Sequence, residues 1–197
     1  MTFAEGVAIK AAGIALDDVG VAVFDFSSIS QRLIGAPLTV VLGREVFDAA
    51  RLEIDIEGGS IRAVSRDAIP AGEEVSLTSG HGLESLPIRV EGAAAVAVFD
   101  LGNGSEMLIG APFAASAGLD GPDRIVGAKA GGGVGGEVTR KLVRLKTVEV
   151  AGVTFRNVEA GIDETETADD ANVGARLLRA FRITVDYVEG KLWLDPR

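Results

Sequence analysis

Apolar and polar residues alternate along much of this chain, and glycine-containing turns separate the alternating stretches. Residues 7–10 and 14–16 flank one such turn, and residues 138–150 and 153–162 flank another. A repeat of two positions is typical of strands with one buried face, whereas helices need a repeat near 3.6. Helical spacing is confined to single turns. The pattern predicts an all-β chain.

Three runs are mostly apolar and depart from this alternation. Residues 19–26 and 94–99 predict buried strands, and the second of these ends at Asp100. Residues 38–42 predict a further short strand, which ends at Gly43.

A segment of the chain occurs twice, at residues 42–63 and 173–194. The matched identities are Gly43 with Gly174, Ala49 with Ala180, Arg51 with Arg182, Asp55 with Asp186 and Gly59 with Gly190. Each copy predicts a glycine, a helical turn, a strand, a turn and a second strand. Residues 7–19 also resemble residues 148–158. Repetition of a whole structural unit indicates two related lobes.

The two lobes are predicted to be unequal. A polar stretch with a Pro-Ala-Gly turn places a linker at residues 67–73. Residues 74–197 predict a complete lobe. Residues 1–66 match only its second half, so they are expected to be the C-terminal half of a first lobe.

Charge and composition exclude several classes of function. The net charge of −10 argues against a nucleic-acid partner and against an anionic membrane surface. The chain has no cysteine, which excludes disulfides, and with a single histidine a zinc site is not expected. We predict no metal and no cofactor, and we interpret His81 as a loop residue. No apolar run is long enough to cross a membrane, and the N-terminus does not have the pattern of a signal peptide.

One acidic residue stands where a carboxylate can do chemistry. Asp100 follows an apolar strand and enters the turn Leu101-Gly102-Asn103-Gly104. Backbone N–H groups of such a turn can hold the carboxylate, and Gly102 lets the chain bend tightly. Two carboxylates about 3 Å apart share one proton, so one activates a water while the other protonates a carbonyl.

The second part of the chain resembles a bacterial retropepsin-like aspartic protease domain. Residues 99–102 stand where that family has a hydrophobic residue followed by Asp-Thr-Gly, and residues 172–178 stand where it has two apolar residues, a glycine and a short helix. A glycine cluster between these motifs stands where the family has its flap, the hairpin that covers the substrate. The cluster is Gly131, Gly132, Gly133, Val134, Gly135 and Gly136.

The resemblance implies a fold, an activity and a substrate class. The fold is the acid-protease β-barrel, and the activity is cleavage of a peptide or protein substrate by an aspartic endopeptidase. Family habit suggests a periplasmic or secreted location. Two residues depart from the family pattern: Leu101 replaces a threonine that locks the active-site loops by hydrogen bonds, and Asn172 replaces an apolar residue.

The source of a second carboxylate is open. Asp25 is a weak candidate, because it follows the same Val-Ala-Val-Phe sequence that precedes Asp100. No glycine follows Asp25, and the interval to Gly43 is too short for a flap, so a turn-capping role is preferred. The remaining candidates are a missing N-terminal segment and the Asp100 of another copy in a homodimer.

Two functions remain open on these grounds. The first is an aspartic peptidase that uses Asp100. The second is a non-catalytic module of the same fold, which binds peptide through its cleft or an exposed strand edge. The acidic run at residues 163–170 is interpreted as a solvated loop, because its spacing matches no calcium-loop pattern.

Overall fold

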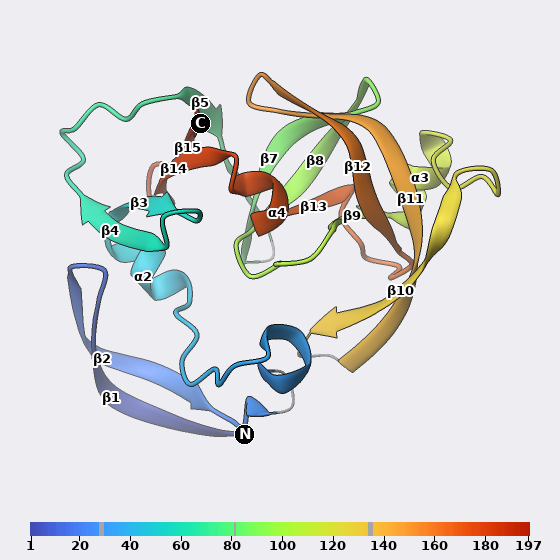
Figure 1. Cartoon of the computed structure of the whole chain (residues 1–197). Coiled ribbons are helices and arrows are strands. Elements are labelled where there is room, and N and C mark those ends of the chain that lie inside the picture. Colours follow the sequence, from blue (N-terminus) through green and yellow to red (C-terminus); the bar gives the residue numbers. More distant parts are fainter. Residues whose placement is uncertain (28–29, 81, 134–135) are drawn as a thin grey trace.

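The computed structural model describes residues 1–27, 30–80, 82–133 and 136–197, and strands make up most of them (Figure 1). The predicted all-β class is confirmed. Helices in these ranges are short: η1 (Ser30–Ile34, a π-helical turn), α2 (Arg44–Ala49), α3 (Ala111–Ser116) and α4 (Ala175–Leu178). None of them combines the length and the apolar surface that a membrane crossing would require. His81 lies outside the described residues.

The largest sheet has the strand order β10-β11-β12-β9-β13-β8-β7-β6. The bounds are β6 (Thr78–Gly80), β7 (Leu83–Val90), β8 (Ala93–Asp100), β9 (Met107–Gly110), β10 (Ile125–Gly133), β11 (Gly136–Val150), β12 (Val153–Asp163) and β13 (Ala171–Gly174). Strand β7 also pairs with β11, with Val90 opposite Val148. This contact closes the strands from β11 to β7 into a barrel, whose interior is filled by fully buried residues such as Ile109, Leu145 and Val173.

A second sheet of five strands has the order β4-β3-β14-β15-β5. The bounds are β3 (Arg51–Asp55), β4 (Ser60–Val64), β5 (Glu73–Ser76), β14 (Phe181–Asp186) and β15 (Lys191–Pro196). The sheet takes strands from both sides of residues 67–73, and the division into domains at that linker stays a prediction.

The centre of this sheet has an approximate two-fold symmetry. Strands β3 and β14 are antiparallel, with Leu52 opposite Val185 and Ile54 opposite Ile183. The offset of 131 residues between the two copies of the repeat exchanges these two pairs. Glu53 pairs with Thr184, its own repeat mate, so the axis passes through this pair. The repeat found in the sequence is therefore also a repeat in space.

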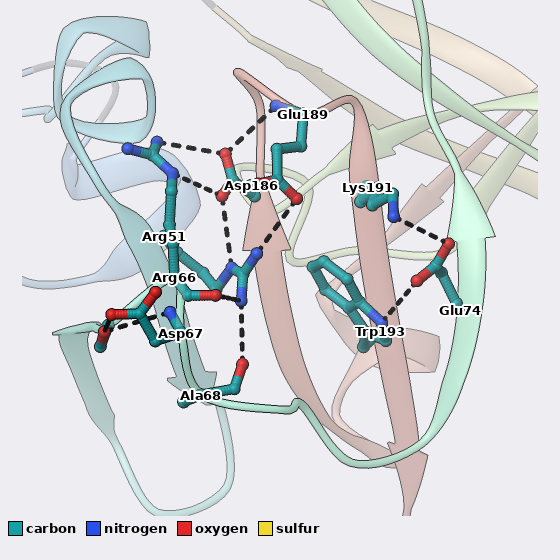
Figure 2. Close-up of polar contacts among 10 residues, drawn as sticks. Arg51, Arg66, Asp67, Ala68, Glu74, Asp186, Glu189, Lys191 and Trp193 are labelled. Carbon is teal, nitrogen blue, oxygen red and sulfur yellow. Dashed lines mark hydrogen bonds and ion pairs between the residues drawn. The ribbon is translucent and has the colours of Figure 1, made fainter.

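A buried ion cluster crosses the same sheet (Figure 2). The carboxylate of Asp186, which is fully buried, accepts hydrogen bonds from Arg51 Nε (3.2 Å) and Arg66 Nε (2.8 Å). Burial alone would raise the pKa of Asp186, but the hydrogen bonds from Arg66, from the Glu189 amide and from Arg51 lower it. The cluster ties the first part of the chain to the last hairpin.

The first hairpin repeats the geometry of β11 and β12. Its strands are β1 (Thr2–Ala11) and β2 (Ile14–Val23), and an offset of 139 residues maps their pairing onto that of β11 with β12 except at an irregularity around Val7. The turns agree as well, because Ala12 and Ala151 both have positive φ, at 53° and 43°. Two consecutive residues with positive φ form the kind of tight turn that suits the twist of a hairpin.

Two predictions from the apolar runs are wrong. Residues 19–26 do not form a buried strand, because residues 19–23 lie at the end of β2, with Val23 exposed, and residues 24–26 lie outside any strand. Residues 38–42 are not a strand at all. A strand exists only where a neighbour satisfies its backbone N–H and C=O groups. Residues 38–42 have no paired neighbour of that kind in the described chain.

Candidate active site

Asp100 ends strand β8 at the place where β8 runs beside β13. The two strands are parallel, with Phe99 opposite Val173 and Asp100 opposite Gly174. The turn after β8 then reaches the start of α4, where the Ala175 amide donates a hydrogen bond to the carbonyl of Asn103 (2.8 Å). Asp100 is therefore fixed by a strand on one side and by a helix start on the other.

Both oxygens of the Asp100 carboxylate accept hydrogen bonds. Oδ1 accepts from the backbone amides of Gly102 (2.9 Å) and Asn103 (3.1 Å), as expected for a carboxylate held by its own turn. Oδ2 accepts from Nδ2 of Asn172 (2.8 Å). Asp100 is half-buried, so the carboxylate is oriented by three donors and still reaches the surface.

Two asparagine side chains link this carboxylate to the rest of the turn. Asn103 Nδ2 donates to Asn172 Oδ1 (2.9 Å) and to the carbonyl of Glu106 (3.1 Å). Asn103 Oδ1 accepts from the Ser105 amide (2.9 Å). From the sequence, Asn172 stands out only as a departure from the family pattern, and Asn103 does not stand out. The signal for Asn103 is its position directly after the Asp-Leu-Gly triplet.

Gly174 lets this turn approach β13 closely. A Cβ atom at this position would overlap the carbonyl oxygen of Asn103 and would crowd its side chain. Since Gly174 lies opposite Asp100, any larger residue would push the Asp100 turn away from α4.

The glycine cluster lies at the end of the hairpin formed by β10 and β11. Gly131 is opposite Val138, Gly132 is opposite Glu137 and Gly133 is opposite Gly136. Val134 and Gly135, which belong to the predicted flap, lie outside the described residues. The hairpin itself is present, and its assignment as a flap stays a prediction.

The middle of strand β10 in this hairpin is tied to the Asp100 turn by a charged side chain. Lys129 Nζ, on β10, lies 2.5 Å from Oε2 of Glu106 and 2.9 Å from Oγ of Ser105. Glu106 is only 5% exposed. Burial would raise its pKa, but the hydrogen bonds from Lys129 and Ser105 lower it. The hairpin and the carboxylate turn are thus held in one arrangement.

Residues 86–177 match the family model described as aspartyl protease, and this range contains the Asp100 turn, the hairpin and β13. This segment is similar to the aspartyl protease family. The resemblance predicted from the motifs is confirmed for this part of the chain. A solved structure of a retropepsin-like aspartic protease from Rickettsia conorii is similar over 61% of this chain and 87% of its own, with 20% identity and a TM-score of 0.49. A comparison with curated proteins found no match.

Leu101 has a structural role in this aspartyl protease segment. Its side chain is half-buried and packs against the hydrophobic core. A threonine hydroxyl at this position would offer a hydrogen bond, whereas Leu101 offers only apolar contact. The hydrogen bonds that orient the turn come instead from Asn103 and Asn172.

Asp100 also lines a pocket of about 310 Å³ together with the acidic loop. Asp163, Asp169 and Leu108 contribute to its walls. Among the described residues, no hydrogen bond joins Asp100 to a second carboxylic acid. Within the same ranges, no three Asp, Glu, His or Cys side chains lie close enough together to hold a metal ion.

Asp25, the weak candidate for a second carboxylate, lies in the loop after β2. Its Oδ1 accepts a hydrogen bond from the Ser27 amide (2.8 Å), and the hydrogen bonds from Ser27 lower the pKa of this exposed group. The contact is the turn-capping arrangement that the sequence favoured. No hydrogen bond or ion pair in the described residues brings Asp25 to Asp100.

A buried glutamate near Asp100 was missed by the sequence analysis. Glu84, on β7, has a side chain that is 2% exposed, and Arg44 Nη1 lies 2.8 Å from its Oε1. The guanidinium of Arg44 also lies over the ring of Tyr187. Burial raises the pKa of Tyr187 to about 12, with further upward contributions from the charges of Glu84 and Asp100. Arg44 directly follows Gly43, so this contact joins the first copy of the repeat to the barrel.

Proposed function

We propose that this chain is an aspartic peptidase in which Asp100 supplies one of two catalytic carboxylates. The observation that carries the proposal is the Asp100 carboxylate, held by three hydrogen bonds at a strand end inside the aspartyl protease segment. An aspartate that only closed a turn would need the two backbone bonds alone. The additional bond from Asn172 fixes the second oxygen, which a purely local turn does not require.

The proposed reaction uses two carboxylates that share one proton. One carboxylate takes a proton from a water molecule, and this water attacks the carbonyl carbon of the peptide bond. The other carboxylic acid donates its proton to the carbonyl oxygen, which gives a tetrahedral gem-diol intermediate. The first carboxyl then gives the proton that it took from water to the amide nitrogen, the C–N bond breaks to release the amine, and a hydroxyl of the intermediate returns a proton to the second carboxylate as the new carboxylic acid forms. The hairpin of β10 and β11 covers the substrate and excludes bulk water. Lys129 and Glu106 keep this hairpin beside the Asp100 turn.

The second carboxylate is proposed to come from outside the described hydrogen-bond partners of Asp100. Two sources are compatible with the site: polypeptide beyond residues 1–197 and the Asp100 of another copy. Asp25 is disfavoured, because its carboxylate is engaged with the Ser27 amide in an exposed turn.

The test is an assay of an unfolded protein or a peptide library at pH 4–6, with and without pepstatin. We expect cleavage that Asp100→Asn abolishes and that Asp25→Asn leaves unchanged. Thermal unfolding of both variants checks that each is folded. Cleavage that persists in Asp100→Asn would overturn the assignment. Saturable peptide binding by the wild type without cleavage would favour the non-catalytic module.

A further inference from the structure

A groove of about 1020 Å³ lies between strand β2 and residues 39–43. Its walls are largely apolar and include Val21, Val23, Val40 and Leu42. Several of these side chains are open to solvent, with Val40 65% exposed and Val23 52% exposed. Contiguous exposed apolar surface of this kind marks an interaction site more often than a free surface.

The corresponding place in the second lobe is filled by a strand. The repeat offsets map residues 21–24 onto residues 160–163 of β12, and residues 40–43 onto residues 171–174 of β13. Strand β9 lies between β12 and β13. It runs parallel to β12, with Ile109 opposite Ile162, and antiparallel to β13, with Ile109 opposite Ala171.

The filled and the open place differ in burial although apolar side chains stand at mapped positions in both, Val23 with Ile162 and Leu42 with Val173. Val23 is 52% exposed, whereas its mate Ile162 is 3% exposed. Leu42 is 36% exposed, whereas its mate Val173 is fully buried. The apolar residues at 21–24 and 40–43 therefore have the character of strands that flank a third strand.

We propose that this groove binds a β-strand of a partner polypeptide from outside residues 1–197. The strand runs parallel to β2 and antiparallel to residues 40–43, and it presents apolar side chains at alternating positions as Met107 and Ile109 do in β9. Strand addition of this kind combines backbone hydrogen bonds with side-chain pockets. The chain's own β9 cannot serve, because Met107 and Ile109 are 2% and 0% exposed within the second lobe. The same holds for β9 of a second copy.

The groove also bears on the source of the second carboxylate, an inference that rests on the proposed peptidase function. In the second lobe, β9 is preceded by β8 and the Asp100 turn, and Asp100 lies opposite Gly174. Gly43 is the repeat mate of Gly174. A partner that supplies a strand pair like β8 and β9 therefore places its own turn beside Gly43. An aspartate in that turn would be the symmetry mate of Asp100.

The test uses a synthetic peptide with the sequence of residues 93–112, which is the chain's own β8 and β9, extended by two terminal lysines for solubility. Binding to the full chain is measured by fluorescence anisotropy of the labelled peptide. Hydrogen exchange then locates the contact. We expect saturable binding and slower exchange at residues 21–24 and 40–43. A scrambled peptide should not bind.

Variants of the full chain separate groove binding from general stickiness. Val23→Lys should weaken peptide binding at least tenfold. Val188→Lys is the matched control, because Val188 is 65% exposed and lies outside the groove. Thermal unfolding should show both variants folded. Equal peptide binding by Val23→Lys and wild type would overturn the proposal, and so would the absence of saturable binding.

Two further readouts distinguish the occupants and the two proposals. If the chain alone forms a dimer that protects residues 40–43 and that Val23→Lys dissociates, a second copy fills the groove and the proposed partner is wrong. A peptide with Asn in place of its Asp100 equivalent should bind as tightly as the parent peptide. Binding of both peptides without proteolytic activity at any pH would support the docking site and count against the peptidase.

Discussion

The charge cluster around Asp186 offers the sharpest test of how this fold is held together. Asp186→Asn keeps the shape of the side chain but removes the negative charge. In the wild type that charge faces Arg51, which is 4% exposed, and Arg66, which is partly exposed. The variant leaves the buried guanidinium of Arg51 without its buried counter-charge.

The expected loss of unfolding free energy depends on the hydrogen bonds that Arg51 keeps in the variant. Removal of one partner of a buried ion pair costs about 3–5 kcal/mol. Arg51 keeps hydrogen bonds to the carbonyls of Arg66 (2.9 Å) and Ala68 (3.1 Å) and to Glu189 Oε2 (3.1 Å). These bonds place the loss at the lower end of the range, at about 3 kcal/mol. For a chain of this size, Tm should fall by roughly 6–12 °C.

The approximate two-fold symmetry supplies a matched control. Asp55 is the repeat mate of Asp186 and pairs with Arg197, but both side chains are partly exposed, at 24% and 30%. Asp55→Asn should therefore cost much less unfolding free energy than Asp186→Asn, because solvent screens the exposed pair. Urea and thermal unfolding of the two variants at pH 7 give the comparison. Equal losses for Asp55→Asn and Asp186→Asn would refute the reasoning, because burial would then have no influence on the pair.

The stability difference between wild type and Asp186→Asn should also depend on pH. The pKa of Asp186 is lowered in the folded state, so the unfolded state binds the proton first as pH falls. The stabilisation is fully present above the unfolded pKa of about 3.9 and is lost as pH falls through the folded pKa. The difference in unfolding free energy between wild type and Asp186→Asn should be constant from about pH 5 to 8 and should shrink below about pH 4.

Three further predictions concern the site and its surroundings. Gly174→Ala should lower the free energy of unfolding in urea by about 1–3 kcal/mol, because the added Cβ overlaps the Asp100 turn. Gly104→Ala is the control: its added Cβ meets open space, so it should change that free energy by less than about 0.5 kcal/mol. Equal effects would contradict the close approach at Gly174. Lys129→Met should raise the pKa of Glu106 and speed hydrogen exchange in β10 around Lys129; unchanged exchange would show that the ion pair does not hold the hairpin. Tyr187 is the single tyrosine, so an ultraviolet absorbance titration should give a midpoint near 12 in the folded chain and near 10 in guanidinium. Stability should fall as pH rises from about 10, because the unfolded chain loses the tyrosine proton first. A folded midpoint near 10 would refute the burial of its hydroxyl.

Several of the strands that the sequence predicted correctly have partners close in the chain or belong to the repeat. Strands β3, β4, β14 and β15 follow from two copies of one pattern, and their pairing is symmetric for that reason. Residues 38–42 have an equally good β pattern but, among the described residues, no neighbouring strand that pairs with them. The pattern reports that a residue run suits a strand, and it carries no information on whether a partner is present.

The site was predictable in its centre and not in its surroundings. Asp100 and its backbone donors are local, because Gly102 and Asn103 are two and three residues away. Asn172 reaches Asp100 across 72 residues, and Arg44 reaches Glu84 across the boundary between the two parts. Contacts of this kind depend on how parallel strands and separate sheets meet. Nothing in the local sequence specifies them.

The two copies of the repeat show that neighbours, more than the unit's own residues, decide burial in this fold. Gly43 and Gly174 both begin a short helix after an apolar run, and β3 and β14 meet symmetrically behind them. Yet β13 is buried beside Asp100, whereas residues 40–42 border an open groove. A sheet that relates the two copies by a two-fold axis also relates the filled place of β9 to the empty one. If the proposed peptidase function and the proposed strand docking both hold, peptidase activity should rise in proportion to the fraction of chains whose groove is occupied.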